Sequence, residues 1–214
     1  MGGYASGPLL YAATGRGIPA LVQEQNSYPG ITNKILASRV SKICVAYDGM
    51  ERFFPKEKLI MTGNPIRQDL MQISGLKQAA SVFFNLEEGV KTVLVIGGSL
   101  GARTINESMA LGIKQLLDQG VQVIWQTGKS FIGEARAINE KFSDRLRVFD
   151  FVSRMDYAYA MADVVVSRAG ATSISELCVV QKPCILVPSP NVSEDHQTKN
   201  SMAMVNQHAA MHVK

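Results

Sequence analysis

From about residue 90 onward, short apolar runs alternate with segments of helical periodicity, and this alternation constrains the fold more than any other feature. Four of the five runs end in glycine or proline. The five runs cover residues 91–98, 121–128, 145–152, 163–170 and 183–190. Strands that alternate with helices are typical of βαβ units, which build a parallel sheet with helices on both faces. The sequence therefore predicts an α/β fold with a Rossmann-like domain over residues 90–214.

The first 67 residues show the same alternation less completely. Helices are expected over 8–17 and 31–40, and strands over 18–26, 41–49 and 58–66. The alternation breaks after residue 67, where a connector with a helix inside it is expected. We therefore predict three parts, which are the second half of a Rossmann-like domain over 1–67, an interdomain connector over 68–89, and the larger domain over 90–214.

Both ends of the chain suggest a longer protein. The chain opens on a Gly-Gly-Tyr loop with no strand ahead of it, although such loops normally follow a strand. At the other end, residues 211–214 are expected to lie inside a helix. Half of a sheet would leave an exposed edge. We therefore expect that neither the first domain nor the last is complete.

Composition narrows the classes of function. The net charge of +4 is too small and too dispersed to indicate nucleic acid binding, and it favours anionic ligands or anionic membrane surfaces. No apolar run reaches the roughly 18–20 residues of a transmembrane helix. His196, His208 and His212 lack zinc-ligand partners, and no DxD carboxylate pair is present. We expect no metal and no cofactor.

A glycine-rich turn, GGSLGAR over residues 97–103, joins the first strand of the larger domain to its helix. Glycines allow close approach of a ligand, and the helix amino terminus offers N–H groups to a phosphate, to which Ser99 adds a hydroxyl. A plain tight turn is the alternative interpretation. The turn departs from GxGxxG, and no acidic residue ends the second strand, which argues against a dinucleotide.

A second such turn, SRAGATSISE over residues 167–176, follows the fourth strand. Thr172 or Ser173 is suited to cap the following helix, with Ser175 or Glu176 completing a capping box. The functional interpretation is that Glu176 accepts hydrogen bonds from both hydroxyls of a ribose. The two interpretations stay open at this point.

Three further polar positions stand out. Arg67, near the domain boundary, carries the rigid fork of donors that grips phosphate, although a surface arginine is the plainer interpretation. The segment 23–26 (QEQN) lies at the carboxyl end of a predicted strand, where α/β sheets bind ligands. Gln197 lies at the start of a helix, with Asp195 suited to cap it.

Seven segments, in order along the chain, resemble the MurG family, the membrane-associated N-acetylglucosaminyltransferases of cell-wall synthesis. They are GGYASGP, QEQNSYPGITNK, GNPIR, GGSLGAR, FDFVSRM, SRAGATSISE and EDHQTKN. The resemblance implies a GT-B fold of two Rossmann-like domains that face each other across a cleft. It also implies inverting transfer of N-acetylglucosamine from UDP to the C4 hydroxyl of the muramoyl sugar of lipid I, giving lipid II, at the cytoplasmic face of the plasma membrane.

The resemblance also implies residue roles. The loop that holds the acceptor diphosphate corresponds to Gly2, Gly3, Tyr4 and Ser6. The residues that correspond to the UDP-N-acetylglucosamine site are Asn26, Arg67, Ser99, Val152, Ala171, Thr172, Ser173, Ile174, Ser175, Glu176 and Gln197. Within this set, the backbone of Val152 corresponds to the uracil contact and Glu176 to the ribose contact.

This chain departs from the family at two positions, where Gln23 replaces a histidine and Thr198 replaces a second glutamine. The first glycine loop of the family, whose histidine is the candidate general base, has no counterpart here, and neither do the last helices. The resemblance therefore describes a fragment that lacks the amino-terminal third and the carboxy-terminal end. It leaves the catalytic residue unidentified and implies that this chain alone does not transfer sugar.

Three alternatives stay open, which are a UDP-N-acetylglucosamine 2-epimerase-like enzyme, a nicotinamide-dependent oxidoreductase and a non-catalytic nucleotide-binding fragment. The expected partners are UDP-N-acetylglucosamine, lipid I and an anionic membrane surface. For the last, the helix at 31–40 and the strand after it carry Lys34, Arg39 and Lys42 near Ile35 and Leu36. Such a pattern suits a weak peripheral surface, or simply a solvated helix face.

Overall fold

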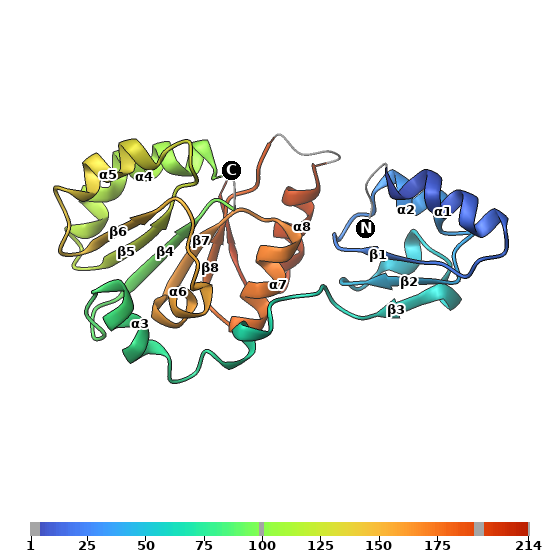
Figure 1. Cartoon of the computed structure of the whole chain (residues 1–214), viewed down its shortest axis with the longest axis horizontal. Helices are drawn as coiled ribbons and strands as arrows, with labels where there is room; N and C mark the ends of the chain where they lie inside the picture. The colour runs from blue at the N-terminus through green and yellow to red at the C-terminus, as the bar shows by residue number, and fades with distance from the viewer. Residues whose placement is uncertain (1–4, 99–100, 191–194, 214) are drawn as a thin grey trace.

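The computed structural model describes residues 5–98, 101–190 and 195–213, which form two α/β units side by side (Figure 1). The first unit is a parallel sheet in the order β1-β2-β3, formed by Leu21–Glu24, Lys42–Val45 and Leu59–Met61. Helices α1 (Ser6–Gly15) and α2 (Ile31–Leu36) lie together over one face of this sheet. Two short 3₁₀ turns, Met50–Arg52 and Lys56–Lys58, connect β2 to β3.

The core of the first unit is small. Its buried side chains include Val22, Leu36, Ile43 and Phe54. Helix α1 buries none of its residues, and Leu21 on the edge strand β1 is 60% exposed. The first unit therefore presents an apolar strand edge and an exposed helix surface that carries Leu9 and Tyr11.

The second unit is a six-stranded parallel sheet in the order β6-β5-β4-β7-β8-β9. Its strands, listed from β4 to β9, are Thr92–Ile96, Gln122–Gln126, Leu146–Phe149, Val164–Ser167, Cys184–Leu186 and Met211–His212. The chain runs outward from β4 through β5 to β6, and then crosses back to β7 on the other side of β4. The order of the strands therefore reverses at the β4–β7 pair.

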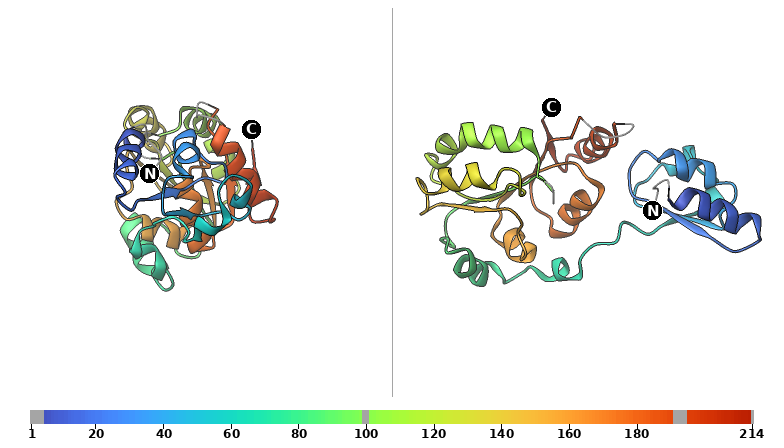
Figure 2. Two further views of the ribbon diagram at one scale, coloured as in Figure 1. Left: turned by 90° about the vertical axis from the view of Figure 1, so that its right-hand side faces the viewer. Right: turned by 45° about the horizontal axis from the view of Figure 1, so that its top comes forward.

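Helices cover both faces of this sheet, as Figure 2 shows from two further directions. Helices α4 (Arg103–Leu117) and α5 (Ile132–Asn139) pack against the side chains of one face, which include Val95, Val123 and Trp125. The opposite face, with Leu94 and Ile124, packs against α3 (Lys77–Phe84), α6 (Met155–Met161) and α7 (Ala171–Val180). Successive strand residues thus enter different cores, as the period of two requires. The predicted α/β fold with parallel sheets is confirmed.

The segment over 68–89 packs on the second unit. It contains a 3₁₀ turn, Gln68–Gln72, and helix α3, and its apolar side chains Leu70, Phe84 and Leu86 lie in the same core as β4 and α7. The side chain of Gln122 on β5 fixes the end of this segment, since its amide oxygen accepts from the N–H of Glu87 at 3.1 Å. The division at residues 67 and 89 itself stays a proposal.

The expectation of a helix over 211–214 is wrong for residues 211–213, and Lys214 lies outside the described residues. Helix α8 (His196–Val205) ends earlier, and His208 follows it with a φ of 55°, in the left-handed region that stops a helix. The chain then extends as β9, which pairs with β8 in parallel, Ile185 opposite Met211. This pairing covers the edge that β8 would otherwise expose. In the part of the chain that the structure describes, no helix has the length and apolar character needed to cross a membrane.

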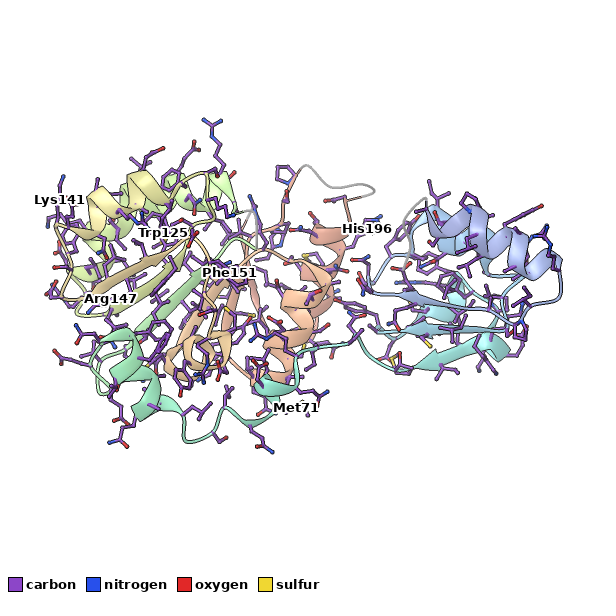
Figure 3. The ribbon with its side chains drawn as sticks, viewed as in Figure 1. Met71, Trp125, Lys141, Arg147, Phe151 and His196 are labelled. Carbon is purple, nitrogen blue, oxygen red and sulfur yellow. The ribbon has the colours of Figure 1, made fainter. Side chains whose placement is uncertain are left out.

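A buried polar contact locks α4 onto the sheet. Asn106 on α4 is fully enclosed, and its amide oxygen accepts from the indole N–H of Trp125 at 3.1 Å. Its amide nitrogen donates to the carbonyl oxygen of Thr127 at 2.8 Å. Figure 3 shows Trp125 on the sheet beneath the α4 and α5 layer. Asn106 therefore satisfies one polar group on β5 and one in the turn just after it.

We predict that Asn106→Ala lowers the free energy of unfolding by about 2–4 kcal/mol, because two buried polar groups lose their partner. Urea denaturation followed by tryptophan fluorescence measures the change. The matched control is Glu107→Ala on the same helix, whose ion pair with Arg103 is largely exposed and screened by solvent, so its loss should change stability little. Equal effects of the two substitutions would contradict this account.

Candidate functional site

The reversal of strand order brings two glycine-rich turns together at the carboxyl ends of β4 and β7. Open α/β sheets bind ligands at this kind of crevice. The turn after β4 approaches the turn after β5 so closely that a Cβ on Gly101 would lie 2.2 Å from the carbonyl oxygen of Thr127. Gly101 also has a φ of 81°, so glycine is required there on both counts. Ser99 lies outside the described residues.

Both helices that follow these turns begin without a side-chain cap among the described residues. Helix α4 begins at Arg103 after Ala102, and α7 begins at Ala171 after Gly170 in an extended conformation. The first backbone N–H groups of each helix have no partner within the helix itself and carry its partial positive charge. The two amino termini together therefore suit an anion such as a diphosphate.

The expectation that Thr172 or Ser173 caps α7 is wrong. Gly170 occupies the cap position, so both residues lie inside the first helical turn. Ser175 does not complete a capping box either, because its hydroxyl donates to the carbonyl oxygen of Ala171 at 2.8 Å, within the helix. Of the predicted residues in this turn, Ile174 is buried in the core. The side chains of Thr172 and Ser173 are left for contact with a ligand.

Glu176 lies one turn further along α7 and is half-buried. Its Oε2 accepts a hydrogen bond from the hydroxyl of Tyr159 on α6, at 3.0 Å. Burial raises the pKa of the Glu176 carboxyl above its ordinary value, whereas the Tyr159 hydrogen bond and the nearby charge of Arg67 lower it. A carboxylate held in this way can accept two further hydrogen bonds from a ligand.

Arg67 lies at the start of the segment that leads into the second unit. Its guanidinium forms an ion pair with Asp69, with 3.1 Å between Nε and Oδ1. The hydrogen bond with Asp69 and, more weakly, the charge of Glu176 raise the pKa of Arg67. Arg67 therefore brings a fixed positive charge to the neighbourhood of Glu176. Its Nε and Nη2 atoms both donate to the Asp69 carboxylate, so Asp69 occupies this side of the partly exposed guanidinium.

Val152 follows β6, and its backbone N–H donates to the Oε1 of Gln126 at 2.8 Å. The Nε2 of the same glutamine donates to the carbonyl oxygen of Gly98 at 3.1 Å. Gln126, at the end of β5, thus joins the turn after β4 to the turn after β6. Sequence reasoning assigned Gln126 no role, although a polar residue at the carboxyl end of a central strand is a signal for the ligand edge.

In the first unit, the segment over 23–26 is organised by a buried carboxylate that sequence reasoning missed. Glu24 accepts from the backbone N–H of Asn26 at 3.0 Å and from the side-chain amide of Asn33 at 2.8 Å. It also accepts from the N–H of Gly30 at 3.0 Å. Gln23 holds a neighbouring loop, since its amide donates to the carbonyl oxygen of Gly63 at 3.0 Å.

Two asparagines join the units. Asn200 on α8 is fully buried, accepts from the backbone N–H of Ser27 at 2.9 Å and donates to the Oδ1 of Asn26 at 3.0 Å. On the other side, the amide of Asn64 donates to the hydroxyl of Ser175 on α7 at 3.0 Å. These contacts bring Asn26 of the first unit to the second. They also occupy the Ser175 side chain, which therefore serves the interface.

The remaining residues named in the sequence analysis lie on or near α8 and α1. Gln197 on α8 accepts a hydrogen bond from the backbone N–H of Ser189 at 2.9 Å. This bond connects α8 to the segment that follows β8. Asp195 precedes α8 with a φ of 53°, and no cap from its side chain is seen among the described residues. His196 begins α8 on the side toward the first unit (Figure 3). Ser6 begins α1, whereas Gly2, Gly3 and Tyr4 lie outside the described residues.

The assembled site combines two helix amino termini, a partly exposed arginine paired with Asp69 and one half-buried carboxylate. The positive groups suit the diphosphate of a nucleotide, and the carboxylate suits a vicinal diol such as that of ribose. Among residues 5–98, 101–190 and 195–213, no three His, Cys, Asp or Glu side chains gather as metal ligands would. The arrangement suits a nucleoside diphosphate, and the first unit contacts α7 and α8 beside it.

Comparison with known proteins agrees with this geometry. The protein "UDP-N-acetylglucosamine--N-acetylmuramyl-(pentapeptide) pyrophosphoryl-undecaprenol N-acetylglucosamine transferase" of Phocaeicola vulgatus is 57% identical over 216 residues, which cover 100% of this chain and 57% of that protein. Its namesake in Parabacteroides distasonis is 55% identical over 219 residues, with 99% and 58% covered. The chain thus spans little more than half the length of these relatives.

Among solved structures, MurG of Acinetobacter baumannii is similar, with a TM-score of 0.77 and 30% identity over 100% of this chain and 58% of that chain. The expected GT-B fold is confirmed by this likeness. Two family profiles also match. The "Glycosyltransferase family 28 N-terminal domain" matches residues 1–45, and the "Glycosyltransferase family 28 C-terminal domain" matches residues 92–214. Since the second match alone covers more than half of the chain, the chain belongs to glycosyltransferase family 28.

Proposed function

We propose that the protein carrying this chain transfers N-acetylglucosamine from UDP to the C4 hydroxyl of the muramoyl sugar of lipid I, giving lipid II. The observation that carries the proposal is the 52–57% identity, along essentially the whole chain, to relatives named for this transfer. The site geometry supports it independently, because two helix amino termini and a carboxylate suit a nucleotide sugar. UDP-N-acetylglucosamine and lipid I are accordingly the proposed substrates.

In this proposal the donor diphosphate lies at the amino termini of α4 and α7, with Arg67 beside it. Ser99, Thr172 and Ser173 add hydroxyl donors. Since Gln126 occupies the N–H of Val152, we assign the carbonyl oxygen of Val152 to the N3–H of uracil. The vicinal hydroxyls of the ribose donate to Glu176. Asn26 of the first unit and Gln197 of the second contact the N-acetylglucosamine sugar. Ala171, Ile174 and Ser175 contribute only backbone groups at the start of α7.

The proposed reaction is a displacement with inversion. The C4 oxygen of the acceptor attacks the anomeric carbon as the bond from that carbon to the UDP oxygen breaks. A base takes the proton from the C4 hydroxyl, and UDP leaves with the negative charge. Helix amino termini and Arg67 stabilise that charge where it develops. The proposed base is the histidine of a glycine loop that has no counterpart in this chain.

The test is a transfer assay with labelled UDP-N-acetylglucosamine and lipid I, on the protein at the length of its relatives. We expect lipid II with a β-linked sugar, and no product from residues 1–214 alone. Conversion of the donor to its 2-epimer without transfer would instead favour the epimerase-like alternative. Formation of lipid II by residues 1–214 would contradict the assignment of the base.

We predict that Glu176→Gln weakens UDP binding roughly ten- to a hundredfold at pH 7, because a charged acceptor of two hydroxyls is lost. In the unsubstituted chain, the affinity should fall as the pH drops through the raised pKa of Glu176, where the carboxylate is protonated. In Glu176→Gln this acid-side fall should disappear. Calorimetry with UDP across pH measures both effects.

Glu176→Gln should also increase the stability of the fold, although it decreases the affinity for UDP. Since burial raises the pKa of Glu176 in the folded chain, ionisation destabilises the fold as the pH rises through that pKa. Glu176→Gln should therefore raise the melting temperature at neutral pH while it weakens UDP binding. The control is Glu107→Gln, an exposed position on α4. UDP affinity that is unchanged in Glu176→Gln would refute the ribose assignment.

The structure changes the set of side chains that are exposed for contact with a membrane. Leu36, expected at the surface, is buried in the first core because α2 turns that side toward β1 and β2. Lys34 lies over the ring of Tyr28 at 4.1 Å, and Arg39 lies over the ring of Tyr11 at 3.9 Å. We propose that the apolar residues exposed on α1 and α2 contact the membrane, with Arg39 beside them for anionic lipid. They are Leu9, Tyr11, Ile31 and Ile35.

We predict that Ile35→Glu reduces flotation of the protein with vesicles that contain anionic phospholipid, because it removes apolar contact and adds repulsion. Binding of the unsubstituted protein should weaken as salt rises. Leu111→Glu is the matched control, since Leu111 is 90% exposed but lies on α4 of the second unit. Vesicle binding that does not change with salt concentration or with lipid charge would rule out the electrostatic contribution.

A further inference from the structure

Tyr159 is a fully buried tyrosine whose hydroxyl contacts Glu176, a residue of the candidate donor site. It lies on α6, and its ring packs in the core formed by the sheet, α3 and α7. Its hydroxyl donates to the Oε2 of Glu176 at 3.0 Å. The tyrosine therefore reaches a proposed ligand-binding side chain through the protein interior.

A tyrosine at such a position requires a physical reason. Phenylalanine would fill the same space without placing a hydroxyl in an apolar core, where an unpaired polar group is destabilising. The partner here is a carboxylate that burial itself disfavours in its charged form. A hydrogen bond to a charged acceptor is about twice as strong as one between neutral groups. Tyr159 thus stabilises the ionised form of Glu176 and limits its rotation.

The geometry also leaves capacity for a ligand. Tyr159 supplies one donor, and the structure places it on Oε2 only. A carboxylate has about four lone-pair sites on its two oxygens. The Oε1 atom and the remaining site of Oε2 are therefore available as a pair of acceptors, at the spacing that two vicinal hydroxyls need.

We propose that Tyr159 is a positioning residue that fixes the Glu176 carboxylate for recognition of the ribose diol, and so sets the preference for ribose over deoxyribose. The inference rests on the proposed donor site, in which Glu176 binds the ribose. Tyr159 does not touch the nucleotide, and it acts through the orientation and charge of Glu176. Its substitution should change selectivity at the sugar and leave the diphosphate contacts intact.

The test compares UDP with 2′-deoxy-UDP by calorimetry on the chain and on Tyr159→Phe. The unsubstituted chain should prefer UDP. Tyr159→Phe should weaken UDP binding by about five- to tenfold and 2′-deoxy-UDP binding by less, so the preference shrinks. The matched control is Tyr157→Phe on the same helix, whose ring instead lies against Arg154 at 3.5 Å. That control should keep the full preference.

The outcomes separate the inference from the function on which it rests. If the unsubstituted chain binds both nucleotides equally, the ribose role of Glu176 fails. If it prefers UDP and Tyr159→Phe keeps that preference, or loses affinity for both nucleotides equally, the positioning role is overturned. A second readout is the acid-side fall of UDP affinity, which should move to higher pH in Tyr159→Phe because the hydrogen bond lowers the pKa of Glu176. An unmoved pH profile would also contradict the inference.

Discussion

The reversal of strand order at the β4–β7 pair is the constraint on which the rest of the site depends. Because β4 and β7 are neighbours, the turns after them begin side by side, and they then lead to helices on opposite faces of the sheet. Open α/β sheets bind ligands at this position. Each turn leads directly into a helix, so two amino termini face the same region. Close packing keeps them there, since the backbone at Gly101 approaches Thr127 too closely for any side chain. In the proposed function, the sheet topology thus supplies the diphosphate position before any charged side chain takes part.

Side-chain hydrogen bonds then connect the second unit to the first. Asn200 contacts both Asn26 and Ser27 across the interface, and Asn64 contacts Ser175. Such contacts are directional, so they set the orientation of the two units as well as their proximity. The proposed transfer depends on that orientation, because the acceptor hydroxyl must meet the anomeric carbon. In this proposal the interface asparagines belong to the same functional arrangement as the residues that bind the donor.

The sequence predicts the larger sheet well, because apolar runs and glycine turns report local structure directly. It fails where the partner of a side chain is set by tertiary placement. Nothing in the sequence singles out Glu24, Gln126 or Tyr159, yet each makes a hydrogen bond that fixes a neighbouring group. The cap of α7 was mispredicted for a related reason, since Gly170 takes the cap position by its backbone conformation alone. The last strand was missed because two residues, Met211–His212, carry too little periodicity to show one.

The central claim is that this chain holds a site for a uridine nucleotide at the β4–β7 crevice. The most direct measurement is a calorimetric titration of the folded chain with UDP, with NAD as the comparison ligand. The account predicts saturable binding of UDP at one site and no detectable binding of NAD, because Gln126 at the end of β5 offers no carboxylate to an adenosine ribose. Binding of NAD as tight as that of UDP, or no binding of UDP by a chain that circular dichroism shows to be folded, would contradict it.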